Sequence, residues 1–162
     1  MQQHEHLAGA ELGSIERELY IDATPDVVYQ VISDPRHVTE WWPDGATYEA
    51  VAGSEGSISF GDCSQGGKLV GFTVVEALPP RSFSFRWTQE PNEAAREGNS
   101  LLVTFELEPS GDGTLVRFRE TGFREMGWEA AVLEATYLDH ANGWEHFLPR
   151  LVSYAESVGS RA

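Results

Sequence analysis

The pattern of apolar and polar positions predicts a run of β-strands in the middle of the chain, after a first strand near its start. The clearest case is residues 81–89, where Phe83, Phe85 and Trp87 fall on one face and polar residues fall on the other. A long apolar run over 67–78 contains Gly71, which predicts a β-bulge or a close approach of another chain segment at that point. The further segments expected as strands are 14–22, 56–62, 101–109 and 114–123. Short polar connections link the later strands, which favours an antiparallel meander.

Two short helices are expected directly after the first strand. Thr24 is a good N-cap, and the first helix should end near Asp34, because Pro35 disfavours helical angles in the residue before it. Pro35 also suits the first turn of a second short helix, which should end near Pro43. The pattern therefore predicts strand, helix, helix, and then a run of strands.

From about Glu129 the apolar spacing changes to three and four residues, which predicts one long C-terminal helix. The apolar stripe consists of Leu133, Tyr137, Ala141, Trp144, Leu148, Leu151, Ala155 and Val158. Gly143 lies inside this helix and is unfavourable there by about 1 kcal/mol relative to alanine. Its presence predicts a bend or a backbone pressed against the sheet.

The order of elements predicts an α+β fold, with a curved antiparallel sheet of about six or seven strands wrapped around the long helix. One helix about 10 Å wide is too narrow to cover such a sheet, so space is expected beside it. We predict a disordered leader at residues 1–13, a single domain at 14–158 and a tail at 159–162.

Several segments resemble a known protein family. "PPRSFSFRW", "GDGTLVRF" and "GWEHFLPRL" are similar to segments of the homologues of the activator of heat-shock-protein-90 ATPase, and the resemblance extends over about residues 14–157. That family belongs to the START-like and birch-pollen-allergen-like (SRPBCC) superfamily, so the resemblance implies a helix-grip fold. Members of the superfamily act in ligand binding, as cyclases or dehydratases, and as co-chaperones. The family name implies a chaperone ATPase as a partner and a role in the stress response.

Charge and composition narrow the classes of partner. Eleven basic against 26 acidic residues give a net charge of −15, which disfavours nucleic acid and anionic membrane surfaces. One cysteine excludes an internal disulfide bond. The sequence shows neither a secretory signal nor an apolar run long enough to span a membrane, so we expect a cytoplasmic protein.

Trp41 and Trp42 are adjacent and cannot both face one side of a regular element. We expect the pair to stand at the mouth of the space between the sheet and the long helix. Bulky residues from both layers are expected to line that space, although each of them could instead be core. The expected lining is Trp41, Trp42, Phe60, Phe72, Phe85, Trp87, Phe105, Phe118, Tyr137, Trp144 and Leu148.

Three polar residues are candidate anchors for a ligand. Arg117 or Arg119 could bind an anionic group if one of them faced inward, whereas ion pairs on an exposed sheet face are the alternative. His140 could form an acid/base couple with Asp139 if it faced the space. The alternative is a histidine at the surface or at the boundary of the apolar stripe. His140 and His146 are six residues apart, unlike the one-turn spacing of a zinc-binding helix, so neither a metal nor a cofactor is expected.

We therefore expect a non-catalytic protein that binds a small apolar molecule between the sheet and the long helix. One alternative is a co-chaperone-like protein that binds a heat-shock ATPase. The other is an enzyme resembling the polyketide cyclases of the superfamily. Either a monomer or a homodimer is compatible with the sequence.

Overall fold

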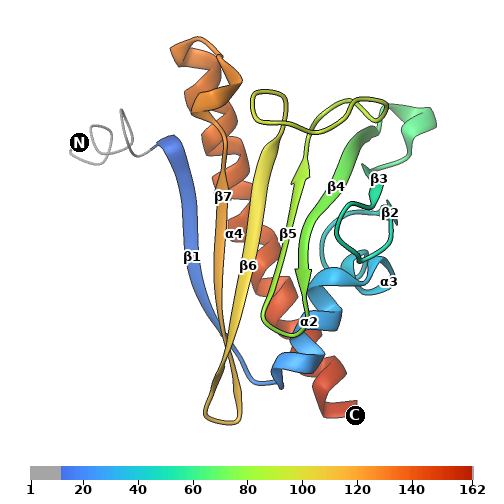
Figure 1. The fold of residues 1–162 in the computed structure, drawn as a ribbon, viewed down its shortest axis with the longest axis vertical. Coiled ribbons are helices and arrows are strands. Elements are labelled where there is room, and N and C mark those ends of the chain that lie inside the picture. Colours follow the sequence, from blue (N-terminus) through green and yellow to red (C-terminus); the bar gives the residue numbers. More distant parts are fainter. Residues whose placement is uncertain (1–11, 162) are drawn as a thin grey trace.

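The computed structural model describes residues 12–161, so most of the predicted leader lies outside the described residues. Its strands are β1 (Ser14–Ile21), β2 (Gly45–Thr47), β3 (Glu55–Phe60), β4 (Lys68–Leu78), β5 (Ser82–Trp87), β6 (Leu101–Ser110) and β7 (Gly113–Thr121). Its α-helices are α2 (Pro25–Ser33), α3 (Pro35–Val38) and α4 (Ala130–Arg161), as shown in Figure 1.

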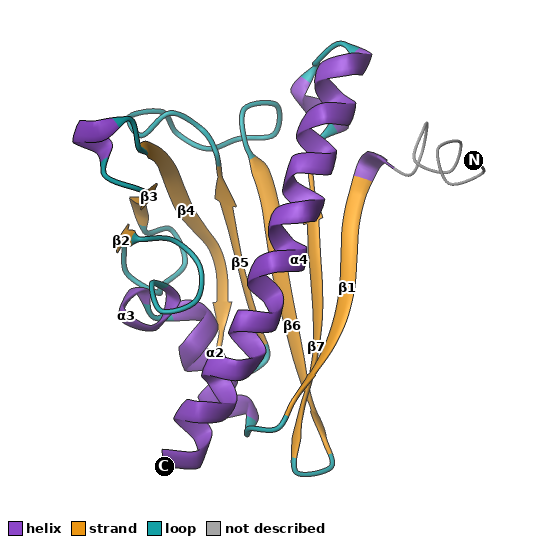
Figure 2. Ribbon diagram, turned by 180° about the vertical axis from the view of Figure 1, so that it is seen from behind, coloured by secondary structure: helices purple, strands orange, loops and turns teal. Residues whose placement is uncertain are grey.

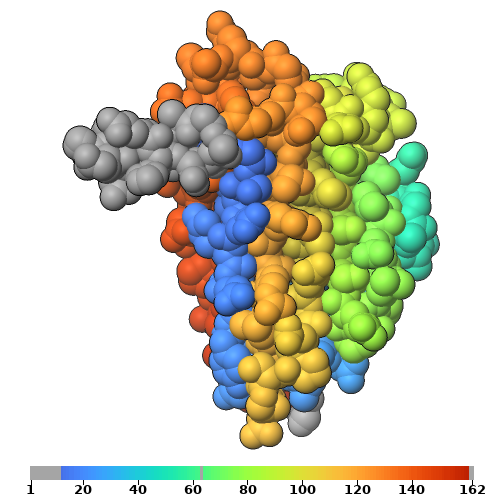
Figure 3. Space-filling model, turned by 60° about the vertical axis from the view of Figure 1, so that its left-hand side comes forward, coloured from blue at the N-terminus to red at the C-terminus, as the bar shows by residue number. Residues whose placement is uncertain are grey.

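The seven strands form one antiparallel sheet in the order β1-β7-β6-β5-β4-β3-β2. The helix α4 runs diagonally across one face of this twisted sheet, and α2 and α3 lie beside its C-terminal half (Figure 2). In the part of the chain that the structure describes, the other face carries no helix, and β1, β7 and β6 lie next to one another along it (Figure 3). The α+β helix-grip fold that the sequence predicts is confirmed.

Capping residues set the ends of the short helices as predicted. The Thr24 hydroxyl accepts a hydrogen bond from the Val27 backbone N–H, and helix α2 ends at Ser33. The Asp34 carboxylate accepts a hydrogen bond of 2.8 Å from the Arg36 backbone N–H and so caps α3. The loop after α3 then carries the two adjacent tryptophans toward the layer between the sheet and α4.

Period-two alternation decides which side chains enter this layer. In β7, Val116, Phe118 and Glu120 are buried, whereas Arg117 and Arg119 are exposed. The inward-facing residues of the sheet pack with one stripe of α4 and with α2 into a single hydrophobic core. Most of the space between the layers is therefore filled by side chains.

Of the two expectations for Gly71, the close approach is confirmed, since a Cβ there would lie 2.8 Å from Nε2 of Gln89, and the register shift of β4 lies between Val74 and Glu76. Three details differ from the sequence-based expectations. Strand β2 is three residues long and was not predicted. Leu12, placed in the leader, is buried, and α4 continues to Arg161.

Gly143 also differs from one of its two expectations, that of a backbone pressed against the sheet. A Cβ added to Gly143 would have no heavy atom within 4 Å. The backbone of α4 therefore does not press against the sheet at this glycine, which borders open space instead.

Candidate functional site

A pocket of about 220 Å³ opens between α4 and the strands β3, β4 and β5. Its walls combine large aromatic side chains with a small number of polar groups, as is usual for small-molecule sites. The lining residues are Trp42, Phe60, Lys68, Val70, Trp87, Thr88, Asp139, His140, Gly143, Trp144 and Phe147.

Trp42 is the centre of the aromatic wall. Its ring centroid lies 4.9 Å from that of Trp87 and 5.0 Å from that of Trp144. Phe60 meets it edge-on at 6.0 Å. Tilted and edge-on contacts at these separations are favourable aromatic geometries, so the wall is held in place before any ligand arrives.

Trp41 is not at the pocket mouth as expected. It is 1% exposed, its indole N–H donates a 3.0 Å hydrogen bond to the Val31 carbonyl, and its ring lies edge-on to Phe105. The two adjacent rings stack on one another with their centroids 6.0 Å apart, and of the two only Trp42 borders the pocket, while Trp41 belongs to the core behind it.

Of the other aromatic and aliphatic residues expected at the site, Phe60, Trp87 and Trp144 also line the pocket. The remainder are buried away from it, in the core that fills the rest of the layer. These core residues are Phe72, Phe85, Phe105, Phe118, Tyr137 and Leu148.

Behind the pocket wall lies a carboxylate that the sequence analysis did not identify. Glu120 has no exposed surface. Its Oε2 accepts a hydrogen bond of 2.7 Å from the indole N–H of Trp87, and its Oε1 accepts one of 2.8 Å from that of Trp144. The Nδ1 atom of His140 lies 3.0 Å from the same Oε1.

The indole donors limit the roles of the other groups in this cluster. An indole N–H can only donate, so each oxygen of Glu120 accepts at least one hydrogen bond. If the carboxylate carries no proton of its own, the remaining contact is a donation from Nδ1–H of His140 to Oε1. Glu120 would then have three donors around it, as a carboxylate removed from water requires.

A signal for Glu120 was present in the sequence. The alternation that places Val116 and Phe118 inward also places Glu120 inward, two residues further along β7. A carboxylate on an apolar strand face needs hydrogen-bond donors, and the same alternation places Trp87 inward on β5. That the three donors converge on this one carboxylate follows only from how α4 crosses the sheet.

The rim of the pocket carries both signs of charge. Lys68, the only lysine of the chain, and Asp139 are exposed there, and Lys68 forms no ion pair with any described residue. Thr88 adopts a φ of +80°, a strained value for a β-branched residue, and its buried hydroxyl has no hydrogen-bond partner within residues 12–161. The polar groups that a ligand can meet are therefore few and distinct.

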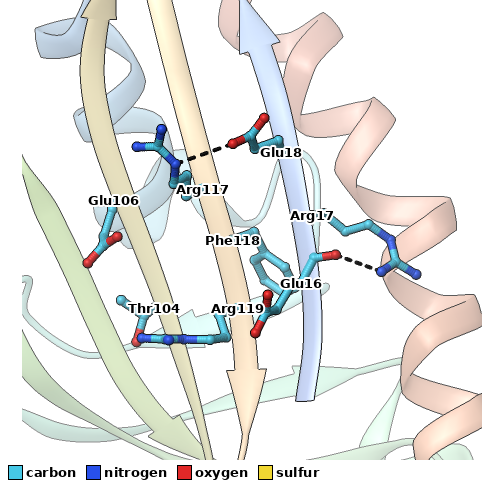
Figure 4. Close-up of a pocket in the computed structure, with 8 residues that line it drawn as sticks. All are labelled: Glu16, Arg17, Glu18, Thr104, Glu106, Arg117, Phe118 and Arg119. Atoms are coloured by element: carbon cyan, nitrogen blue, oxygen red, sulfur yellow. Dashed lines mark hydrogen bonds and ion pairs between the residues drawn. The ribbon is translucent and has the colours of Figure 1, made fainter. Parts of the chain in front are cut away.

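Arg117 and Arg119 do not reach this pocket. Both lie on the exposed face of β7, and Figure 4 shows Arg117 directed toward Glu18 on the neighbouring strand. Arg117 also pairs with Glu108, so the alternative of ion pairs on an exposed sheet face describes it. Successive side chains of β7 point to opposite faces of the sheet. Arg117 and Arg119 therefore point outward, because Phe118 between them points inward.

A larger hollow of about 440 Å³ lies on this outer face, around the two arginines (Figure 4). Its lining is mostly charged side chains, among which Arg117 pairs with Glu18, while Arg17 pairs with Glu145 on α4. A binding site for a small molecule usually offers apolar contact area as well, so the aromatic pocket is the better candidate although it is smaller.

Within residues 12–161 no group of three or more histidine, cysteine or acidic side chains is placed to hold a metal ion. Nor does any helix in this part of the chain have the length and apolar character needed to cross a bilayer.

Comparison with solved structures shows the same fold in several bacterial proteins. Protein MLL2253 from Mesorhizobium loti matches with a TM-score of 0.69 and 18% identity over 89% of this chain and 97% of the other. The Aha1 dimer from Colwellia psychrerythraea matches with a TM-score of 0.65 and 23% identity over 88% and 96% of the two chains. CalU16 from Micromonospora echinospora matches with a TM-score of 0.61 and 20% identity over 91% and 79%. At these identities the likeness shows the fold alone.

No curated protein sequence matches the chain. The family model described as "Activator of Hsp90 ATPase homolog 1-like protein" matches residues 22–156, which extend from the residue after β1 to the last turns of α4. The chain therefore belongs to the family of Activator of Hsp90 ATPase homolog 1-like proteins.

Proposed function

We propose that the protein binds a small, largely apolar molecule in the pocket beside Trp42, without transforming it. The observation that carries this proposal is the aromatic wall itself, in which Trp42, Trp87 and Trp144 border an open space of about 220 Å³. Indole rings that border empty space offer a ligand large, rigid contact areas at low entropic cost.

The size of the pocket limits the ligand. Sites for drug-sized molecules commonly measure about 300–1,000 Å³, so this pocket suits a molecule of one or two fused rings. Burial of about 200 Å² of apolar ligand surface would contribute about 5 kcal/mol, which corresponds to a dissociation constant of the order of 0.1 mM. Ring stacking would strengthen binding beyond this value.

The direct test is a titration of the protein with 2-methylnaphthalene, followed by tryptophan fluorescence. We expect saturable binding of one molecule per chain. Phe147→Ala, which removes a partly buried wall of the pocket, should weaken binding several-fold. Val152→Ala is the matched control, because Val152 is also a partly buried residue of α4 but does not line the pocket. Equal effects of the two variants, or no saturable binding, would contradict the proposal.

Native mass spectrometry of protein purified from its own host tests the same proposal without a chosen probe. A co-purifying small mass that the Phe147→Ala variant loses would support it. A co-purifying mass retained by that variant would place the ligand elsewhere.

A second candidate function is binding to a chaperone ATPase, which the family description favours. Adding the protein to a purified Hsp90-type chaperone at low salt should then change the rate of ATP turnover. An unchanged rate together with no co-elution would remove this candidate. The same chromatography would show whether the chain is a monomer or, like its relative from Colwellia, a dimer.

A further inference from the structure

We infer that the pocket selects a ligand bearing a hydroxyl group on an aromatic ring, and that Nε2 of His140 accepts the hydrogen bond from this hydroxyl. This inference rests on the proposed function, because it specifies the chemical class of the molecule that the aromatic pocket binds. Three observations carry it, on His140, on the charges around it and on the pocket walls.

The first observation is that His140 has one nitrogen committed and one free. Its Nδ1 lies 3.0 Å from Oε1 of Glu120, a carboxylate oxygen to which an Nδ1–H can donate, and Glu120 has no exposed surface. The two nitrogens of an imidazole point to opposite sides of the ring, so Nε2 is directed away from the buried carboxylate. No described residue forms a hydrogen bond with Nε2, the side chain is 14% exposed, and His140 lines the pocket.

Glu120 also fixes the chemical character of this free nitrogen. With the proton of a neutral imidazole held on Nδ1, Nε2 carries a lone pair and acts as an acceptor. The ring is itself wedged between Trp87 at 5.3 Å and Phe123 at 5.6 Å, measured between ring centroids. Glu120 is thus a positioning residue, and His140 presents a fixed acceptor to the ligand.

The second observation is that the charges around the pocket favour a neutral donor over an ion. The rim carries one positive and one negative side chain, Lys68 and Asp139, and the buried carboxylate of Glu120 lies behind the wall. The whole chain carries a net charge of −15, which opposes the approach of an anion. A cation would be repelled by the positive charge of Lys68. A neutral hydroxyl is therefore compatible with both rim charges, that of Lys68 and that of Asp139.

The third observation is the geometry of the walls. Trp42, Trp144 and Phe147 supply the ring surfaces against which a planar molecule can pack, while His140 stands at the same pocket. A flat ring system that stacks on these walls can direct a hydroxyl in its own plane toward Nε2. A purely apolar ligand would leave that nitrogen buried without a partner, which is unfavourable.

The test compares 2-naphthol with 2-methylnaphthalene, which differ by a hydroxyl in place of a methyl group of similar size. The quantity measured is the ratio of their dissociation constants, by tryptophan fluorescence, in the wild type and in His140→Phe. We expect the preference for 2-naphthol to fall about tenfold in His140→Phe, because the phenyl ring keeps the shape and lacks the acceptor. An unchanged ratio would overturn the inference.

Asp139→Asn is the matched control, because Asp139 adjoins His140 at the rim and also carries acceptor oxygens. The preference should survive in this variant, and its loss there with retention in His140→Phe would assign the hydroxyl to Asp139 instead. If 2-methylnaphthalene binds and 2-naphthol gains no advantage in the wild type, only the hydroxyl inference fails. If neither probe binds, the proposed function fails with it.

A second measurement does not depend on any variant folding. Long-range ¹H–¹⁵N correlation spectra distinguish the two neutral tautomers of a histidine. We expect His140 to carry its only ring proton on Nδ1, and a proton on Nε2, in the other tautomer or in the doubly protonated ring, would overturn the inference.

Discussion

Gly143 offers the sharpest test of the site, because one position links helix stability to the space in the pocket. It lies inside α4, lines the pocket, and an added Cβ would meet no heavy atom within 4 Å. Replacing glycine by alanine inside a helix contributes about 0.8–1.0 kcal/mol, because glycine loses more backbone entropy on folding. With no steric cost to subtract, Gly143→Ala should raise the free energy of unfolding by about 1 kcal/mol.

The assay is urea or thermal unfolding followed by circular dichroism. For a chain of this size, 1 kcal/mol corresponds to a rise in Tm of about 2–4 °C. Gly159→Ala is the comparison in the same helix, since a Cβ there would lie 3.0 Å from Cβ of Ala23. The increase in the free energy of unfolding should be smaller for Gly159→Ala than for Gly143→Ala. A loss of stability in Gly143→Ala would refute the open space that the structure places beside this glycine.

Gly143→Leu extends the same change into the pocket. The added side chain should occupy part of the 220 Å³ and weaken binding of 2-methylnaphthalene at least tenfold, while the fold is retained. Asn142→Leu, at the neighbouring exposed position, should leave binding unchanged. Equal affinity in both variants would place the ligand outside the pocket.

Three further results are expected. Glu120→Gln should lower the free energy of unfolding by about 2 kcal/mol in urea titrations, because an amide N–H would face a donor, and an unchanged midpoint would contradict the hydrogen-bond network. Thr88→Gly should raise stability by about 1 kcal/mol by relieving the positive φ, and a decrease would show that the strain is absent. Hydrogen bonding to Arg36 holds the pKa of Asp34 below its usual range, so its contribution is present above about pH 4 and lost as the pH falls further. Asp34→Ala should therefore cost about 1 kcal/mol at pH 7 and progressively less in acid, whereas a cost independent of pH would refute this role.

Much of the fold could be predicted from local patterns. Alternation, apolar runs and turn residues identified six of the seven strands that the structure describes, and Thr24 and Pro35 marked the two ends of the first short helix because capping and proline act within a few residues. The exception is β2, which has only three residues. A segment that short has no period to detect, so its pairing with β3 is decided by tertiary contacts.

The candidate site was predictable only in part. Trp42, Trp87 and His140 were expected at the site and line the pocket, while Trp41 was expected there and lies in the core. The difference between the two adjacent tryptophans depends on the direction of the loop after α3, which no periodicity describes. Glu120 was missed, although alternation alone would have turned it inward.

The sequence by itself determined most of the secondary structure, its order along the chain and the alternation of strand residues between two faces, because these follow from local geometry and capping. Only the tertiary structure decided that Trp87, Trp144 and His140 meet at one buried carboxylate, and that Gly143 borders a pocket. These contacts join residues far apart in the chain, and they depend on how the sheet twists and where α4 crosses it.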